Sequence, residues 1–336
     1  MRSVFFPGLV NDPFGDPALY VLLPHRGEAL LFDCGDLHPL PARDLLKIRH
    51  IFISHAHIDH LAGFDALLRH FLYREEPLRL YGPPGFTERV AHKLAGYTWN
   101  LIESYPLTVI VREWGEESGK ETTFRAREAF QPGTMQPVPC SAGVLLDTPD
   151  YCVRAIPLTH GDIVSLGFAL EETLHVAVHG DVLEARGYLP GPWLTELKQL
   201  LRRGADGTTP ITIPLTGGGE ETQPLRTVAA ALTHAERGMK IVYITDVAPT
   251  DANAERIVAL AADAHLLAIE AAFSHRDLSR AQQRNHLTAA IAGTLGHRAG
   301  AARLLVFHHS PRYQDEPQLL AEEATQAFRT GRPPAI

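Results

Sequence analysis

His55-Ala56-His57-Ile58-Asp59-His60 is the most informative stretch of this chain, and Gly63 follows it shortly. Four side chains that can bind metal fall within these six residues, directly after an apolar run from His50 to Ser54. The pattern is H-x-H-x-D-H, in which alternate residues can point at two different ions. Two adjacent divalent ions usually indicate hydrolysis, often of a phosphodiester. The stretch therefore predicts a two-metal site where a strand gives way to a helix.

Composition favours a large α/β protein without a general attraction to nucleic acid. The chain has 336 residues, 45% of them apolar, which is enough for a large core. Its 31 basic and 39 acidic residues give a net charge of −8, so any contact with nucleic acid must come from a local patch or from the metals. Three scattered cysteines form no C-x-x-C pair, and no run of 18 apolar residues occurs. We expect a soluble, cytoplasmic protein.

Five short apolar runs each end at a residue that can bind metal or move a proton. The runs cover residues 50–54, 151–159, 240–245, 265–269 and 303–307, and they end at His55, His160, Asp246, Glu270 and His308. Runs this short and rich in Val, Ile and Phe are typical of buried strands. Because functional groups in layered α/β folds lie at strand ends, we expect these five ends to converge on one site.

Apolar residues at helical spacing lie between these runs, which indicates an α/β chain. The expected helices cover residues 61–73, 86–94, 227–237, 252–262 and 278–296. Two polar, turn-rich segments, Gly115 to Ala126 and Gly204 to Pro224, are expected to be exposed loops. No period of 20 to 50 residues stands out, which argues against a solenoid.

The H-x-H-x-D-H element at the end of a strand resembles that of the metallo-β-lactamase superfamily. The resemblance implies a four-layer αβ/βα sandwich, formed here as a single domain over residues 1–336. It also implies two zinc ions, the first bound by His55, His57 and His160, the second by Asp59, His60 and His308, with Asp246 bridging both. Such ligands suit Zn²⁺, although Mn²⁺ or Fe²⁺ fits them as well. A hydroxide shared by the two ions would be the nucleophile.

Two of these ligands have simpler alternatives. Asp246 follows a buried strand and could instead be the N-cap of the next segment. His308 has the neighbour His309, and only one of the two can point inward if the strand alternates. We choose His308 because the family pattern described next favours it, and not because of periodicity.

The C-terminal third resembles one branch of the superfamily, ribonuclease Z, the tRNA 3′-processing endonuclease. The E-A-T-[FY], H-S-T and H-x-S-x-R-Y segments of that family have counterparts in the same order at 270–273, 286–288 and 308–313. The resemblance implies that Glu270 and His286 pair beside the metals and that His286 protonates the departing oxygen. Asp59 can accept the proton of the hydroxide while it binds the second ion. The simpler alternative for His286 is a residue at a helix start that faces water.

A further segment, Gly187 to Lys198, resembles the G-x-P-x-G-P-x-x-x-x-L-K stretch of ribonuclease Z. The resemblance implies an exosite arm at about 182–215 that grips tRNA. Four basic residues would supply its phosphate contacts: Arg186, Lys198, Arg202 and Arg203. A solvated helix after a Pro-rich turn is the alternative. The family also commonly forms dimers, so a homodimer is implied by the resemblance alone.

The chain departs from the family pattern in several places. Phe5 to Leu9 stands where the family has an F-L-G-T-G-like turn, Ser54 replaces a Thr, and residues 96–149 have no recognisable counterpart. The leading hypothesis is a zinc-dependent phosphodiester hydrolase that removes 3′ trailers from tRNA precursors. A phosphodiesterase for cyclic nucleotides or other small diesters is the second hypothesis. A thioesterase of the glyoxalase II type and a metal-binding scaffold without catalysis are the others.

Overall fold

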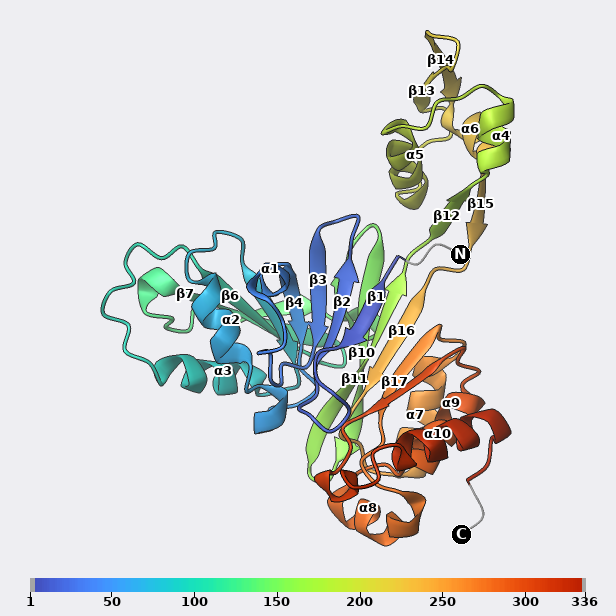
Figure 1. Ribbon diagram of the computed structural model, residues 1–336. Coiled ribbons are helices and arrows are strands. Elements are labelled where there is room, and N and C mark those ends of the chain that lie inside the picture. Colours follow the sequence, from blue (N-terminus) through green and yellow to red (C-terminus); the bar gives the residue numbers. More distant parts are fainter. Residues whose placement is uncertain (1–3, 334–336) are drawn as a thin grey trace. The chain divides into compact units, whose positions relative to one another are not determined.

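The computed structural model describes residues 4–333, except for the side chains of residues 175, 235 and 236 (Figure 1). The chain divides into two compact units. The first comprises Met1–Leu145, Val153–Ala169 and Lys240–Ile336, and the second comprises Leu146–Cys152 and Leu170–Met239. All the metal-competent residues singled out above belong to the first unit. No helix in the described part of the chain is long and apolar enough to cross a membrane.

An eight-stranded sheet forms the N-terminal half of the first unit, with its strands in the order of the chain. They are β1 (Phe6–Leu9), β2 (Leu19–Leu23), β3 (Glu28–Phe32), β4 (Ile48–Phe52), β5 (Leu78–Gly82), β6 (Thr108–Glu113), β7 (Ser118–Arg125) and β8 (Gln136–Pro139). The strands from β3 to β6 are parallel, while the strands at both edges are antiparallel to their neighbours. Parallel pairing places the end of β4, where His55 follows, in the middle of the sheet.

A six-stranded sheet has the order β18-β17-β16-β11-β10-β9. Its strands are β9 (Val144–Asp147), β10 (Tyr151–His160), β11 (Ile163–Glu172), β16 (Lys240–Ile244), β17 (Leu266–Glu270) and β18 (Leu304–Phe307). The last three are parallel, with Ile244 beside Ile269 and Glu270 beside Phe307. Their carboxyl ends therefore meet at one edge, where Asp246, Glu270 and His308 lie.

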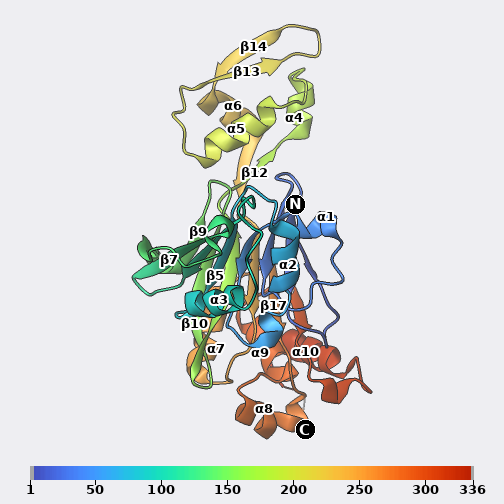
Figure 2. The same cartoon turned by 90° about the vertical axis from the view of Figure 1, so that its left-hand side faces the viewer.

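The two sheets face each other in the first unit, and aromatic rings fill the space between them. Phe32 of the first sheet lies 5.8 Å from Phe168 and 5.9 Å from Tyr243 of the second, measured between ring centroids. Helices cover the outer faces (Figures 1 and 2). They are α1 (Ala42–Leu45), α2 (Phe64–Phe71) and α3 (Phe86–Ala95) on one side, and α7 (Asp251–Ala261), α9 (Ala289–Arg298) and α10 (Leu319–Thr330) on the other. The expected four-layer αβ/βα sandwich is confirmed.

The second unit has a small core of its own. It contains α4 (Gly180–Ala185), α5 (Trp193–Arg202), α6 (Leu225–Leu232), the hairpin of β13 (Pro210–Pro214) with β14 (Glu220–Pro224), and the antiparallel pair β12 (His175–Val178) and β15 (Thr233–Glu236). Trp193 and Leu197 of α5 pack there with Ile211 and Val228. The backbone N–H of Glu172 donates to the carbonyl oxygen of Met239 at 2.9 Å, so the entering and leaving segments are joined.

Four local predictions from the sequence were wrong. The segment 115–126 is mostly the strand β7 and not a loop, because pairing with β6 and the inward side chains of Thr122 and Phe124 outweigh its polar composition. The segment 204–224 contains the β13–β14 hairpin. The helix expected over 227–237 ends at Leu232 and continues as β15. The helix expected over 278–296 is two helices, α8 (Leu278–Arg284) and α9, separated by Asn285 in a left-handed conformation.

Gly63 is required by a close approach of two backbone segments under the site. Its N–H donates to the carbonyl oxygen of Cys34 at 2.9 Å, and a Cβ atom at Gly63 would lie 2.1 Å from the carbonyl oxygen of Gly35. Because backbone cannot yield as a flexible side chain can, we expect Gly63→Ala to lower the free energy of unfolding by about 2 kcal/mol.

The matched control for this prediction is Gly8→Ala in β1, where an added Cβ meets nothing within 4 Å. We expect that change to stay within about 0.5 kcal/mol of the wild type. Urea unfolding of both variants measures the difference. Equal stability of the two variants would contradict the close-approach argument.

Candidate active site

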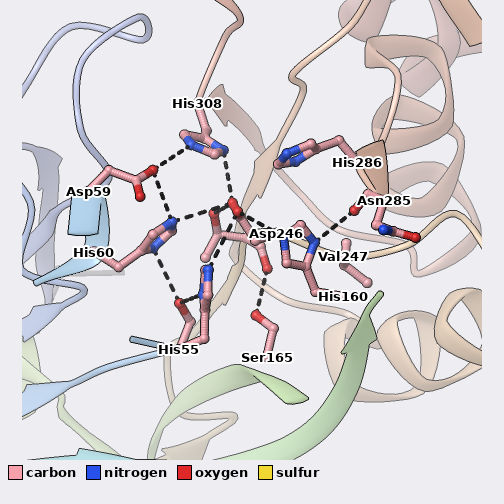
Figure 3. A network of polar contacts seen from close by, with 12 residues as sticks. His55, Asp59, His60, His160, Ser165, Asp246, Val247, Asn285, His286 and His308 are labelled. Atoms are coloured by element: carbon pink, nitrogen blue, oxygen red, sulfur yellow. Dashed lines mark hydrogen bonds and ion pairs between the residues drawn. The ribbon is translucent and has the colours of Figure 1, made fainter. Parts of the chain in front are cut away.

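The predicted site residues lie together at one edge of the two sheets, and Figure 3 labels most of them. His55, His57, Asp59 and His60 occupy the turn after β4, His160 ends β10, Asp246 follows β16, Glu270 ends β17, His286 lies between α8 and α9, and His308 follows β18. Three groups among them each place one potential ligand atom per residue within 4.8 Å of the others. The groups are His55, His57, His160 and Asp246; Asp59, His60 and His308; and Asp246, Glu270, His286 and His308.

The carboxylate of Asp246 stands between two pairs of imidazoles. Its Oδ2 lies 3.6 Å from Nε2 of His55 and 3.5 Å from Nε2 of His160. Its Oδ1 lies 3.5 Å from Nε2 of His60 and 2.9 Å from Nδ1 of His308. Each oxygen therefore serves one pair, which is the arrangement that a carboxylate bridging two ions requires.

Three of these separations, at 3.5 to 3.6 Å, fit divalent ions better than hydrogen bonds. Four ligands at the usual zinc distances of about 2.0 to 2.1 Å on a tetrahedron lie about 3.3 to 3.4 Å from one another. Nε2 of His55 and Nε2 of His60 are buried without a hydrogen-bond partner. Buried polar atoms are rarely left without one, so these nitrogens fit the role of metal ligands. The residues present can thus hold two metal ions.

The electrostatics favour ionised carboxylates around this cluster. Burial opposes the charge of Asp246, but the nearby His308 and His60 outweigh it and hold the pKa of Asp246 well below its usual range. Burial likewise opposes the charge of Asp59, while the neighbouring His308 and His60 lower its pKa. Burial and the neighbouring His60 lower the pKa of His55 to about 2. Ionised carboxylates and a neutral imidazole, as at His55, are forms that bind metal.

Asp33 is a buried carboxylate beside the site that the sequence patterns did not single out. It is fully buried, and its carboxylate accepts hydrogen bonds from the backbone N–H of Ser54 at 2.7 Å, the hydroxyl of Ser54 at 2.9 Å and the hydroxyl of Tyr243 at 2.9 Å. Its Oδ2 also lies 2.8 Å from Nδ1 of His60, which leaves Nε2 of that ring facing Asp246 and Asp59. Its signal in the sequence was a lone Asp directly after the apolar run 29–32.

Other bonds orient the remaining ligands. Nδ1 of His160 lies 2.9 Å from the carbonyl oxygen of Asn285, so Nε2 faces Asp246. Asn253, at the start of α7, is buried and bonds to the backbone and side chain of Thr159, next to His160, and to the carbonyl oxygen of Ala248.

The backbone itself is strained at several of these positions. Asp33, Asp246 and His308 have positive φ values of 55°, 43° and 59°. Non-glycine residues seldom adopt this conformation, and such strain clusters where the surrounding structure serves function.

Glu270 and His286 form a close pair beside Asp246. Nδ1 of His286 lies 2.7 Å from Oε2 of Glu270, whose Oε1 accepts from the backbone N–H groups of Val247 at 2.9 Å and Leu287 at 3.3 Å. Burial alone would lower the pKa of His286, but the charge and hydrogen bond of the fully buried Glu270 outweigh it and raise the pKa. The pair can therefore supply a protonated imidazole next to the cluster.

His308 and His309 have different surroundings. Nδ1 of His309 lies 2.9 Å from the carbonyl oxygen of Ala271, and its ring packs edge-on against Phe14 with centroids 5.3 Å apart. Burial lowers the pKa of His309 to about 4. Only His308 of the two reaches the carboxylates of Asp59 and Asp246.

A pocket of about 520 Å³ opens beside the cluster. Its lining includes Asp59, His286 and His308 from the site, together with Phe14, Asp16 and Phe273. Its remaining charged residues are Arg280, Arg284 and Arg312, all of them exposed. The pocket therefore has carboxylates, imidazoles and guanidinium groups along its wall.

Arg202, which was expected to contact phosphate, is engaged within the protein. The guanidinium group of Arg202 lies 2.9 Å from Asp150 and 3.5 Å from Glu172, and its Nε donates to the carbonyl oxygen of Leu174. This arginine stabilises the second unit. Arg186 and Arg203 are exposed.

We expect Asp33→Asn to weaken metal binding about 10- to 100-fold, because the amide cannot accept all the hydrogen bonds that orient His60 and Ser54. Competition with a chromogenic zinc chelator measures the affinity. Asp36→Asn, an exposed carboxylate that lies outside the ligand groups, is the control. Unchanged zinc affinity in the Asp33 variant would remove its role in orienting the ligands.

Comparison with known proteins agrees with this geometry. Residues 30–185 match the family described as the β-lactamase superfamily domain. Ribonuclease Z of Deinococcus radiodurans is 33% identical over 95% of this chain and 94% of its own length. Ribonuclease BN of Cronobacter sakazakii is 33% identical over 89% of this chain and 84% of its own. The fold is similar to that of the metallo-β-lactamase fold protein YhfI from Bacillus subtilis, with a TM-score of 0.53 and 16% identity over 96% of this chain and 94% of that one. The chain therefore belongs to the ribonuclease Z family of the metallo-β-lactamase superfamily.

Proposed function

We propose that the protein is a metal-dependent endonuclease that removes 3′ trailers from tRNA precursors. The observation that carries this proposal is the Glu270–His286 pair, 2.7 Å apart, beside a carboxylate flanked by two pairs of imidazoles. Metal binding alone does not need such a pair, but cleavage with a poor leaving group needs an acid. The 33% identity with a ribonuclease Z over nearly the whole chain supports tRNA as the substrate.

The metal assignment is part of the proposal. Two zinc ions would be held by the seven expected ligands, with His55, His57 and His160 on one side of Asp246 and Asp59, His60 and His308 on the other. Bound divalent ions lower the pKa of water and neutralise charge on phosphate oxygens. Mn²⁺ or Fe²⁺ would supply the same chemistry.

The residues of the chain have separate tasks in this reaction. His286 donates a proton from its ring to the departing oxygen, and Glu270 holds that ring in place through Nδ1. Because Nδ1 of His286 is bonded to Glu270, Nε2 of the same ring is the nitrogen that would face the substrate. Asp59, whose side chain is 35% exposed, can accept a proton from the attacking water. Its backbone position is set by the 3-10 turn Ile58–His60.

The second unit is proposed to be the exosite arm. The stretch that resembles the arm motif includes the first turns of α5, whose apolar face packs in the core of that unit. The unit contains eleven acidic and six basic residues, so contacts to tRNA would depend on a few local donors and on shape more than on overall charge. A homodimer and a cytoplasmic location belong to the same proposal.

The acidic balance of the second unit also favours a second candidate function. A small phosphodiesterase would use the same metals and the same acid but would gain nothing from an arm. Its substrate would need to fit only the pocket beside His286.

Replacing residues 174–237 by a short glycine-containing turn separates the two candidates, because Glu172 and Met239 are already hydrogen-bonded at the base of the second unit. The zinc-loaded intact and shortened proteins would each receive a 3′-extended tRNA precursor and an activated aryl phosphodiester. We expect the intact protein to cleave both, and the shortened protein to lose at least about 100-fold on the precursor but far less on the aryl diester. Failure of the intact protein to cleave the precursor would favour the small phosphodiesterase.

Glu270→Gln should change the pH dependence of precursor cleavage. The charge of Glu270 raises the pKa of His286, so the protonated acid persists to higher pH and activity falls as the pH rises through that pKa. Without the charge the pKa falls, and the alkaline limb of kcat should move to lower pH. An aryl diester with a good leaving group should show a smaller change, because it needs less protonation. If the alkaline limb of kcat lay at the same pH in Glu270→Gln as in the wild type, this pair would not act as the acid.

A further inference from the structure

The pocket beside the metal site carries two arginines that the proposed reaction does not use. Arg280 and Arg284 lie on α8, four residues apart and hence on one face of the helix. Both are exposed and line the pocket together with His286 and His308. His286 follows Arg284 by two residues, so α8 leads directly to the proposed acid.

Neither guanidinium group is engaged by a carboxylate among the residues that the structure describes. Arg276, one turn earlier, is by contrast ion-paired with Glu316 at 2.7 Å and lies over the ring of Tyr313. The hydroxyl of Tyr313 in turn donates to Asp277. Glu316 and Asp277 are thus occupied by other partners, and Arg280 and Arg284 have no ion pair in the described part of the chain.

The charge of the chain makes this local arrangement informative. With a net charge of −8, the protein as a whole repels a polyanion, so binding must come from local positive groups. The metal cluster would take the phosphate that is cleaved. A polynucleotide carries further phosphates next to it, and guanidinium groups bind phosphate oxygens in a two-pronged geometry.

We infer that Arg280 and Arg284 form a subsite for the backbone phosphates that flank the scissile phosphate of a single-stranded RNA. The inference rests on the proposed nuclease function and adds to it a means of selecting polynucleotides over small diesters. Arg312 lines the same pocket, but it belongs to the segment on which the family resemblance rests and is left out of the test.

A structural role is the competing explanation for Arg284. It ends α8, where a positive side chain interacts favourably with the helix dipole. A merely structural role would alter thermal stability but not the dependence of RNA binding on salt. The salt dependence counts the phosphates that the protein neutralises, with a slope of about 0.7 for each contact on a single strand.

The test uses the zinc-loaded full chain and a 12-nucleotide single-stranded RNA as an inhibitor of aryl phosphodiester hydrolysis. The variants are Arg280→Gln/Arg284→Gln, the charge-retaining Arg280→Lys/Arg284→Lys, and the control Arg329→Gln, an exposed arginine of α10 outside this pocket. The inhibition constant is measured over a range of salt concentrations. KM and kcat for a 3′-extended tRNA precursor are measured in parallel.

For the double Gln variant we expect the inhibition constant of the RNA to rise about tenfold and the salt slope to fall by about 1.4, the value for two lost contacts. The Lys variant should recover part of the affinity, and Arg329→Gln should match the wild type. KM for the precursor should rise more than kcat falls. An unchanged inhibition constant and slope in the double Gln variant would overturn the inference, as would an equal loss in Arg329→Gln.

The inhibition assay does not depend on tRNA cleavage. If the wild type fails to cut the precursor while the RNA inhibits through the two arginines, the subsite stands and the proposed tRNA function fails. If the wild type cuts the precursor and the arginines have no effect on either assay, the function stands and the subsite fails.

Discussion

An ionised carboxylate buried between four imidazoles is the constraint on which the rest of this structure depends. Asp246 is only 3% exposed, and a lone charge at such a depth would be costly. The histidines around it cannot all be protonated, because like charges would then crowd one another. Divalent ions resolve both difficulties, since they satisfy the carboxylate and the unpartnered ring nitrogens together.

The position of Asp246 in turn depends on contacts between the two sheets. Asp33 follows a strand of the first sheet. Its carboxylate accepts a hydrogen bond from the hydroxyl of Tyr243 in the second sheet, and the same carboxylate contacts the ring of His60. The aromatic rings between the sheets hold this contact in place. Packing and ligand geometry are therefore connected: a shift of one sheet against the other would move His60 away from Asp246.

Charge is distributed unevenly over the chain, and this matters for an enzyme that acts on RNA. The overall balance is acidic, yet the pocket next to the proposed acid holds guanidinium groups. Attraction to a substrate would thus be short-ranged, with the ions and the arginines acting at the site itself and little steering from a distance. Such an arrangement stabilises an RNA strand that already lies in the pocket more than one that touches the rest of the protein surface.

The sequence by itself determined the fold class and the residue types of the site, because H-x-H-x-D-H and the apolar runs before His160, Asp246, Glu270 and His308 are local patterns. It could not find Asp33, whose role arises from partners 21, 27 and 210 positions away. Periodicity also left His308 and His309 unresolved, and only the left-handed backbone of His308 turns that residue toward Asp246. The polar segment that became β7 was misread because its strand character comes from pairing with β6. Local sequence patterns predict which residue types a site contains. Contacts between residues distant in the sequence form only when the two sheets pack together, so the sequence patterns do not predict them.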